Sequence, residues 1–330
     1  MRTKSLAIFT ACLLAANGNA VANDSSAKIS AGGIVLEKTD KVRMLSEDLY
    51  VSKDLVKVSY VYKNITGSPA NLTVAFPLPK ITAESVYESY PEHFADTRFI
   101  NFTTKIDGVA IEPREIINIK SHDGRNVTDF FKQRGLPLAP FDDFWSFGFD
   151  NEYDDVKNVV LLDELRQEKL LVKDADGYER RAWTTEIYYV WQYTFEPNVA
   201  VQVDHSYAPI IGGQFFAGDV TYDDWSFKAY FQKEFCASEG EWNALEKINA
   251  KIANPLISEV GYILQTGNNW AGTIGNFRLT LDKSDPRNIV TLCWDGKLTK
   301  IAPTQFRFEA ENYTPNQDIV MAVTQGYRDY

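Results

Sequence analysis

One long run of alternating side chains constrains the fold of this chain more than any other feature. Over positions 183–195, every second residue is aromatic, aliphatic or threonine: Trp183, Thr185, Ile187, Tyr189, Trp191, Tyr193 and Phe195. After Glu196-Pro-Asn198 the alternation resumes with Val199, Val201, Val203, His205 and Tyr207. A period of two is typical of a β-strand with one apolar face. We therefore predict a long antiparallel hairpin, and so aromatic a face needs a large partner surface, as at the centre of a sheet.

The N-terminal third also predicts strands. Residues 56–62 alternate, and residues 72–78 do so again after a turn at Gly67-Ser-Pro69, a pattern typical of an antiparallel hairpin. A further short run ends at Asp107-Gly108, a dipeptide that favours hairpin turns. Because short strands with turns at this spacing are typical of a β-sandwich, we expect one over residues 23–123.

Helical patterns occur in two places. Residues 124–180 contain two short stretches of helical spacing, and we interpret this segment as a partly helical insertion. Ser238 and Glu241 form a capping box, and apolar residues then recur at helical spacing, which predicts a helix over 238–253. Strand patterns return afterwards, so residues 181–330 form a second β-region. The expected fold class is mainly β, with two antiparallel, sandwich-like regions.

The first 22 residues resemble a secretory signal peptide. A basic start is followed by an apolar run from Leu6 to Ala16 and by the small residues Ala20-Val21-Ala22. We expect cleavage between Ala22 and Asn23, and a periplasmic or secreted bacterial protein. Phe9-Thr-Ala-Cys12 loosely resembles a lipoprotein processing box. Cleavage at that box would instead make Cys12 a lipidated N-terminus. The apolar run is shorter than the roughly 20 residues that span a bilayer, so we expect no stable membrane span.

Cleavage at Ala22 would leave two cysteines, Cys236 and Cys293. An even pair in an exported protein favours a disulfide, and the alternative is two buried thiols. In this prediction Cys236 ends a strand-like run over residues 229–235, and Cys293 lies in a strand.

Composition excludes some classes of partner. The formal net charge is −11, and residues 1–22 contribute only the cations Arg2 and Lys4 besides neutral residues, so the mature chain is still more acidic. An acidic surface repels phosphate backbones, and we expect no nucleic-acid partner. Metal-ligand spacings, nucleophile motifs and phosphate loops do not occur, so we expect no metal and no cofactor.

His205 is the one weak catalytic candidate. It lies on the apolar side of its predicted strand, where the usual role is a core histidine with satisfied ring nitrogens. An inward histidine that is partly solvated can also titrate near neutral pH and act as an acid or base. Asp204 or Asp219 would then supply the carboxylate.

The segment 266–278 is rich in glycine, asparagine and tryptophan, which indicates a tightly shaped loop entering a strand. Trp270 and Arg278 form a candidate pair for stacking and anion binding, and the alternative is a structural connection whose tryptophan fills the core. Further candidate binding residues lie in or just after the predicted hairpin that contains His205: Trp191, Tyr207, Gly212 and Gly213.

Several motifs together resemble an exported bacterial family, domain of unknown function 4424. They are Ser46-Glu-Asp-Leu49, Ala75-Phe-Pro-Leu-Pro79, Val203-Asp-His-Ser-Tyr207 with Gly212-Gly213, the segment 266–278, Pro303-Thr-Gln-Phe306 and Tyr313-Thr-Pro315 with Asp318-Ile319. The resemblance covers almost the whole mature chain and implies no catalytic residues. Tyr60 to Pro79 is also similar to the start of the vault/inter-α-trypsin-inhibitor domain, a β-sandwich interaction module.

We therefore expect a binding or scaffolding protein of the cell envelope, with an envelope protein or a saccharide as its partner. The alternative is a hydrolase of an envelope polymer that uses His205 and a neighbouring carboxylate. A concave pocket with both groups would favour the enzyme. An exposed aromatic or apolar patch without such convergence would favour the binding protein.

Overall fold

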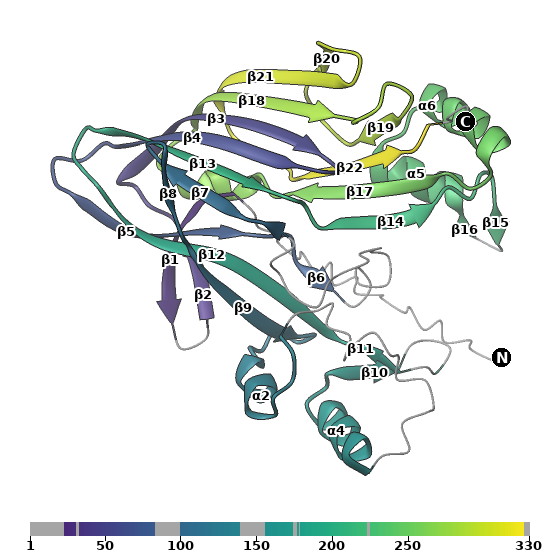
Figure 1. Cartoon of the computed structure of the whole chain (residues 1–330), viewed down its shortest axis with the longest axis horizontal. Helices are drawn as coiled ribbons and strands as arrows, with labels where there is room; N and C mark the ends of the chain where they lie inside the picture. Colours follow the sequence, from purple (N-terminus) through teal and green to yellow (C-terminus); the bar gives the residue numbers. More distant parts are fainter. Residues whose placement is uncertain are drawn as a thin grey trace, which may run out of the picture.

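The computed structural model describes residues 23–30, 33–82, 100–138, 156–173, 177, 179–222 and 225–326. About half of this part of the chain is strand, arranged in several sheets, so the mainly-β prediction is confirmed. The predicted signal peptide lies outside the described residues. Figure 1 shows two large sheets stacked on each other, with helices at two ends of the molecule.

The larger sheet has eight strands in the order β20-β21-β18-β3-β4-β13-β7-β8. Their bounds are β3 Val42–Ser52, β4 Val56–Asn64, β7 Thr103–Ile106, β8 Val109–Ile111, β13 Ala200–Tyr207, β18 Ile274–Asp282, β20 Thr299–Lys300 and β21 Gln305–Tyr313. All neighbours pair antiparallel except β18 with β3, which pair in parallel. The β7–β8 hairpin turns at Asp107-Gly108, as predicted.

A bulge in β3 explains one glycine of β18. The β3–β4 register shifts between Met44 and Ser46, and β18 lies against the bulge from the other side. A Cβ at Gly275 would collide with the backbone carbonyl oxygen of Leu45. Only glycine therefore lets β18 approach β3 here.

The second large sheet has six strands, in the order β2-β1-β5-β12-β6, with β9 also paired to β12. Their bounds are β1 Ser25–Ser30, β2 Gly33–Glu37, β5 Ala70–Pro77, β6 Ile81–Thr82, β9 Arg114–Ser121 and β12 Trp183–Phe195. Side chains of β12 that face the eight-stranded sheet join the main core, including Ile187, Tyr189 and Trp191. The long aromatic strand is central in its sheet.

Both long hairpins predicted from the sequence are wrong. β4 and β13 pair with each other in the eight-stranded sheet, whereas β5 and β12 pair with each other in the six-stranded sheet. The turns at residues 65–69 and 196–199 therefore each carry the chain from one sheet to the other. In this arrangement the apolar faces of the two sheets meet across one core, where they are buried.

Asn64 links the two turns that carry the chain between the sheets. Its Nδ2 donates to the carbonyl oxygens of Ser68 at 2.9 Å and Phe195 at 2.7 Å. Its Oδ1 accepts from the backbone and hydroxyl of Thr66. The side chain is fully buried, so these bonds satisfy an amide that water cannot reach.

A smaller sheet closes the other end of the core. Its order is β14-β17-β22-β19, with bounds β14 Ile211–Phe215, β17 Leu256–Tyr262, β19 Ile289–Leu292 and β22 Ile319–Thr324. One face joins the main core, and the other packs on helices α5 Phe227–Phe235 and α6 Glu239–Ile252 around buried aromatic side chains. The capping box of Ser238 and Glu241 is present. A two-residue pair of strands, β15 Thr221–Tyr222 and β16 Trp225–Ser226, precedes α5.

The predicted disulfide is present between Cys236 and Cys293, whose Cα atoms are 4.9 Å apart. The strand predicted over residues 229–235 is wrong, because these residues lie in α5. Phe227, Phe231 and Phe235 recur at helical spacing and are all buried, so one face of the helix is apolar. The disulfide ties the C-terminal end of α5 to the end of β19.

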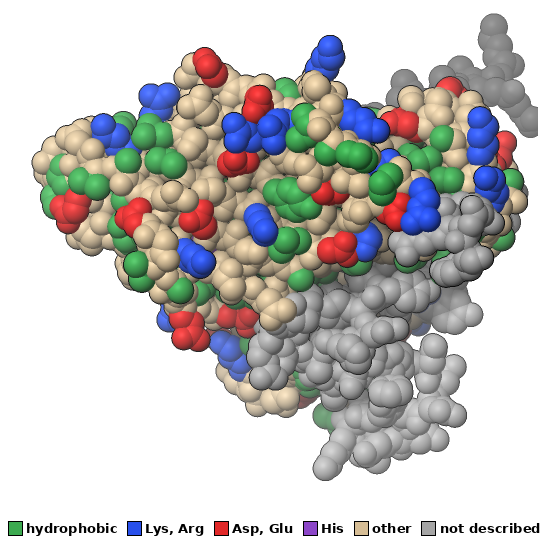
Figure 2. Space-filling view, turned by 45° about the horizontal axis from the view of Figure 1, so that its top comes forward, with side chains coloured by type: hydrophobic (Ala, Val, Ile, Leu, Met, Phe, Trp, Pro, Cys, Tyr) green, Lys and Arg blue, Asp and Glu red, His purple; other side chains and the backbone are tan. Residues whose placement is uncertain are grey.

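The segment between β9 and β12 is partly helical. It contains helices α2 Thr128–Gln133 and α4 Val156–Gln167 and the hairpin β10 Leu171–Lys173 with β11 Glu179–Arg181. Phe131 and Leu165 pack with Trp183 in a core of their own. Within the described residues, no helix has both the length and the apolar character needed to cross a bilayer. Figure 2 shows one face of the molecule, where charges of both signs alternate with small hydrophobic groups.

Candidate functional site

A cluster of polar side chains lies inside the main core, on the inner face of the eight-stranded sheet. We call it the buried polar cluster. Its members are Asn23, Asp24, Glu47, Tyr60, Tyr62, Thr104, His205, Tyr262 and Trp270. Each of them is at most 3% exposed. Polar groups removed this far from water must satisfy one another.

His205 is held at both ring nitrogens. Its Nδ1 lies 3.0 Å from the Thr104 hydroxyl, and its Nε2 lies 3.1 Å from Oδ1 of Asp24. The side chains of His205 and Asp24 have no exposed surface. Four aromatic rings lie with centroids 5.0–5.8 Å from the imidazole: Tyr60, Phe76, Phe102 and Trp191. The imidazole therefore has no exposed surface, and the geometry is that of a core histidine.

Glu47 is the second buried carboxylate. Its Oε2 accepts a hydrogen bond from Nδ2 of Asn23 at 3.1 Å, and its Oε1 accepts one from the Tyr262 hydroxyl at 3.4 Å. The Tyr262 hydroxyl in turn lies 2.9 Å from that of Tyr60. Desolvation, with a smaller contribution from the charge of Asp24, raises the pKa of Glu47 to about 8. Burial likewise raises the pKa of both tyrosines well above the usual value.

The glycine- and asparagine-rich segment holds the chain just before and within β1. Trp270 donates its indole N–H to the carbonyl oxygen of Asp24 at 2.7 Å, and Asn269 donates to the Ser25 hydroxyl at 2.8 Å. A Cβ at Gly267 would lie 3.1 Å from Nδ2 of Asn23, so glycine here leaves room for that amide. The segment includes the 3-10 helix η2 Gln265–Asn269.

The C-terminal motif fixes this loop in turn. Asp318 accepts hydrogen bonds from the backbone N–H groups of Leu264 and Gln265 at 2.9 and 3.0 Å. Asn268 donates to the carbonyl oxygen of Pro315 at 2.7 Å. The motifs that resemble the family are distant in sequence, but several of them meet at residues 23–25.

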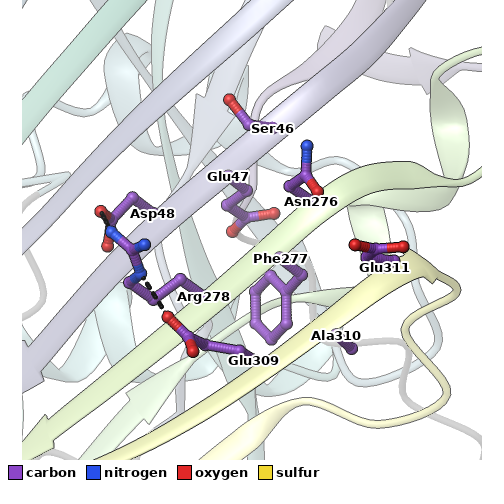
Figure 3. Close-up of a pocket in the computed structure, with 9 residues that line it drawn as sticks. All are labelled: Ser46, Glu47, Asp48, Asn276, Phe277, Arg278, Glu309, Ala310 and Glu311. Carbon is purple, nitrogen blue, oxygen red and sulfur yellow. Dashed lines mark hydrogen bonds and ion pairs between the residues drawn. The ribbon is translucent and has the colours of Figure 1, made fainter.

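The surface of the eight-stranded sheet carries an open depression of about 490 Å³ above β3, β18 and β21. Two cross-strand rows of polar side chains line it, as Figure 3 shows: Ser46, Asn276 and Glu311 in one, Asp48, Arg278 and Glu309 in the other. Arg278 donates to Asp48 and Glu309, both at 2.9 Å. The floor is backbone of a sheet whose opposite face is the core.

The structure separates most of the predicted site residues. Trp191, Tyr207 and Trp270 are core side chains, whereas Arg278 is about half exposed on the outer face. Trp270 and Arg278 therefore form no stacking pair, and Arg278 is paired with carboxylates instead.

The predicted partners of His205 also lie elsewhere. Asp204 lies on the opposite face of β13, and Asp219 is exposed in the loop after β14. Gly212 and Gly213 lie in β14 opposite Glu259 and Ser258, at the edge of the smaller sheet.

Sequence reasoning missed Asp24 and Glu47. Glu47 did leave a signal, because it alternates with Leu49 and Val51 and so lies on the inner face of its strand. Asp24 left none, since its burial depends on strands far away in the chain. Across the described residues, no three His, Cys, Asp or Glu side chains are arranged to hold a metal ion.

The fold and this site describe a mainly-β protein with a polar cluster at the centre of its core. The chain belongs to the family described as "Domain of unknown function (DUF4424)", whose model matches residues 22–321. A comparison with curated proteins gave no match. A solved structure from Legionella pneumophila, called "a putative nutrient binding protein", is similar over 92% of this chain and 72% of its own, with 11% identity and a TM-score of 0.42.

Proposed function

We propose that this chain is an exported binding protein of the bacterial cell envelope. It recognises a polar partner, a saccharide or an envelope protein, at the depression above β3, β18 and β21. The order of basic, apolar and small residues before Asn23 supports export. The two polar rows of the depression carry the binding proposal, because they present hydrogen-bond donors and acceptors on a rigid sheet.

The chemistry of the depression favours a partner with hydroxyl or cationic groups. Asp48, Glu309 and Glu311 supply three carboxylates, and Arg278 neutralises only one charge among them. Asn276 offers an amide that both donates and accepts. A sheet surface exposes these groups in one plane, which suits an extended chain lying across the strands.

The buried titratable groups do not favour hydrolysis. Acid–base catalysis requires a titratable group within hydrogen-bond reach of the substrate. Glu47 and His205 are at most 2% exposed and face the core, while the open depression displays carboxylates beside an arginine. Binding is therefore the function that the geometry supports best.

The test compares surface variants of the exported protein. Asn276→Ala and Glu311→Ala should each weaken capture of envelope glycan fragments or envelope proteins by about tenfold, the loss expected for one or two hydrogen bonds. Neither change affects the core. Glu112→Gln, at an exposed site between β8 and β9, is the matched control and should bind normally.

The readouts are glycan-array binding and crosslinking in intact cells, with the melting temperature as the folding check. Equal capture by both depression variants, the control and the wild type would show that this surface is not the binding site.

A further inference from the structure

The predicted mature N-terminus lies inside the core. Asn23, the residue after the expected cleavage site, is fully buried, and so is Asp24. Asn23 contacts Glu47 and the carbonyl oxygen of Leu264, both of which belong to the main core. Signal-peptide cleavage at this position would therefore create a charged amino group beside a buried carboxylate.

In the described part of the chain, no lysine or arginine of the buried polar cluster pairs with that carboxylate. The titratable groups that face Glu47 are acidic or neutral: Asp24 before β1, Tyr60 and Tyr62 on β4, Tyr262 on β17 and Tyr313 on β21. His205 on β13 is engaged with Asp24. Within the described residues, no lysine or arginine forms a hydrogen bond or ion pair with Glu47. An ionised carboxylate without a partner is costly in such a place.

An unpaired acceptor lies beside the same carboxylate. Oδ1 of Asn23 is buried and has no hydrogen-bond donor. The backbone nitrogen of Asn23 is four bonds from its Nδ2, so it lies within roughly 5 Å of the amide that already contacts Glu47. A positive charge at this nitrogen would therefore lie in the neighbourhood of both the unpaired Oδ1 and the carboxylate.

We propose that the buried polar cluster is a binding site for the α-ammonium group of Asn23, and that this group is the counter-ion of Glu47. A signal peptidase and one water molecule hydrolyse the Ala22–Asn23 amide bond. The new carboxylate leaves with Ala22, and the amino group that stays on Asn23 takes up a proton near neutral pH. The proposal rests on the export part of the proposed function.

The loop that holds residues 23–25 then has a defined role. Trp270, Asn269 and Gly267 position the backbone just before β1, and the freed ammonium adds the ion pair that completes the cluster. In a chain that still carries residues before Asn23, the same nitrogen belongs to a neutral peptide bond. Glu47 then has no cationic partner there, and its raised pKa favours the protonated form near neutral pH. Processing thus couples export to the final stability of the sandwich.

The test uses two proteins made without the export machinery. One begins at Asn23, released from a fusion by a protease that leaves no extra residue, and the matched control retains Ala20–Ala22. Acylation of the α-amino group should be at least about tenfold slower in the folded Asn23 protein than in urea, because a buried amine reacts only on opening. In the control, folded and unfolded chains should react alike.

A second readout is the effect of the three-residue extension on the melting temperature. The extension should lower it at pH 7 and have a much smaller effect in the Glu47→Gln background. Acylation of the folded Asn23 protein at the unfolded rate, or an extension without effect on stability, would overturn the proposal. The intact mass of the periplasmic protein tests export separately. A mass that corresponds to an N-terminal residue other than Asn23 would overturn the proposal. A mass that still includes residues 1–22 would contradict the proposed export.

Discussion

Removal of the Cys236–Cys293 disulfide should destabilise the protein by an amount set by the length of the loop that the disulfide closes. The two residues are 57 positions apart, and a cross-link of that span stabilises by about 4 kcal/mol through the entropy of the unfolded chain. Neither residue is buried, since Cys236 is exposed and Cys293 is partly exposed. Serine at both positions therefore buries no new polar group, and the loss should come mainly from the cross-link.

The assay is urea unfolding of the Cys236→Ser/Cys293→Ser protein beside the wild type, with and without reductant. The double variant should lose about 4 kcal/mol of unfolding free energy, and reduced wild type should match it within about 1 kcal/mol. Fully reduced wild type that unfolds at the urea concentration of the oxidised protein would refute this reasoning. Two free thiols in denatured, unreduced protein would do so as well.

Three further predictions concern the core. His205→Ala and His205→Gln should each lower the unfolding free energy by about 1–3 kcal/mol, because both leave buried Asp24 or Thr104 without its partner. Urea unfolding measures this loss. A Gln variant with wild-type stability but no partner capture would contradict the structural role. Asn64→Ala should lower the unfolding free energy by about 2–3 kcal/mol in the same assay, since it removes the hydrogen bonds to Ser68 and Phe195 that link the two turns. In the chain that retains Ala20–Ala22, Glu47 holds its proton more tightly when folded, with a pKa of about 8 against 4.5. Its unfolding free energy should therefore fall by up to about 1.4 kcal/mol per pH unit as the pH rises from 4.5 to 8. Glu47→Gln should remove that slope in denaturation measured across pH, and an unchanged slope would show that Glu47 is not its source.

Local patterns predicted several of the strands and the capped helix, because such patterns depend only on neighbouring residues. Alternation located the strand Trp183–Phe195, and the Ser238–Glu241 box located the start of α6. The strand predicted over residues 229–235 was wrong, because the helical spacing of Phe227, Phe231 and Phe235 begins before that run and is only partly contained in it.

The candidate site was only partly predictable. His205 was identified as an inward histidine, and its core role agrees with the contacts at both ring nitrogens. The carboxylate partner of His205 was not identified, because Asp24 is 181 positions away in the chain. Arg278 was identified by its loop, but the sequence could not show that its partners are Asp48 and Glu309 on other strands.

The sequence by itself therefore determined a mainly-β chain with its apolar faces, its capped helix and a cysteine pair. Only the tertiary structure decided that β4 and β13 lie in one sheet while β5 and β12 lie in the other. The physical reason is that alternation defines the face a strand buries without defining the strand beside it. That choice depends on packing the whole core at once, and the same packing encloses Asn23 and Asp24 beside Glu47 and His205.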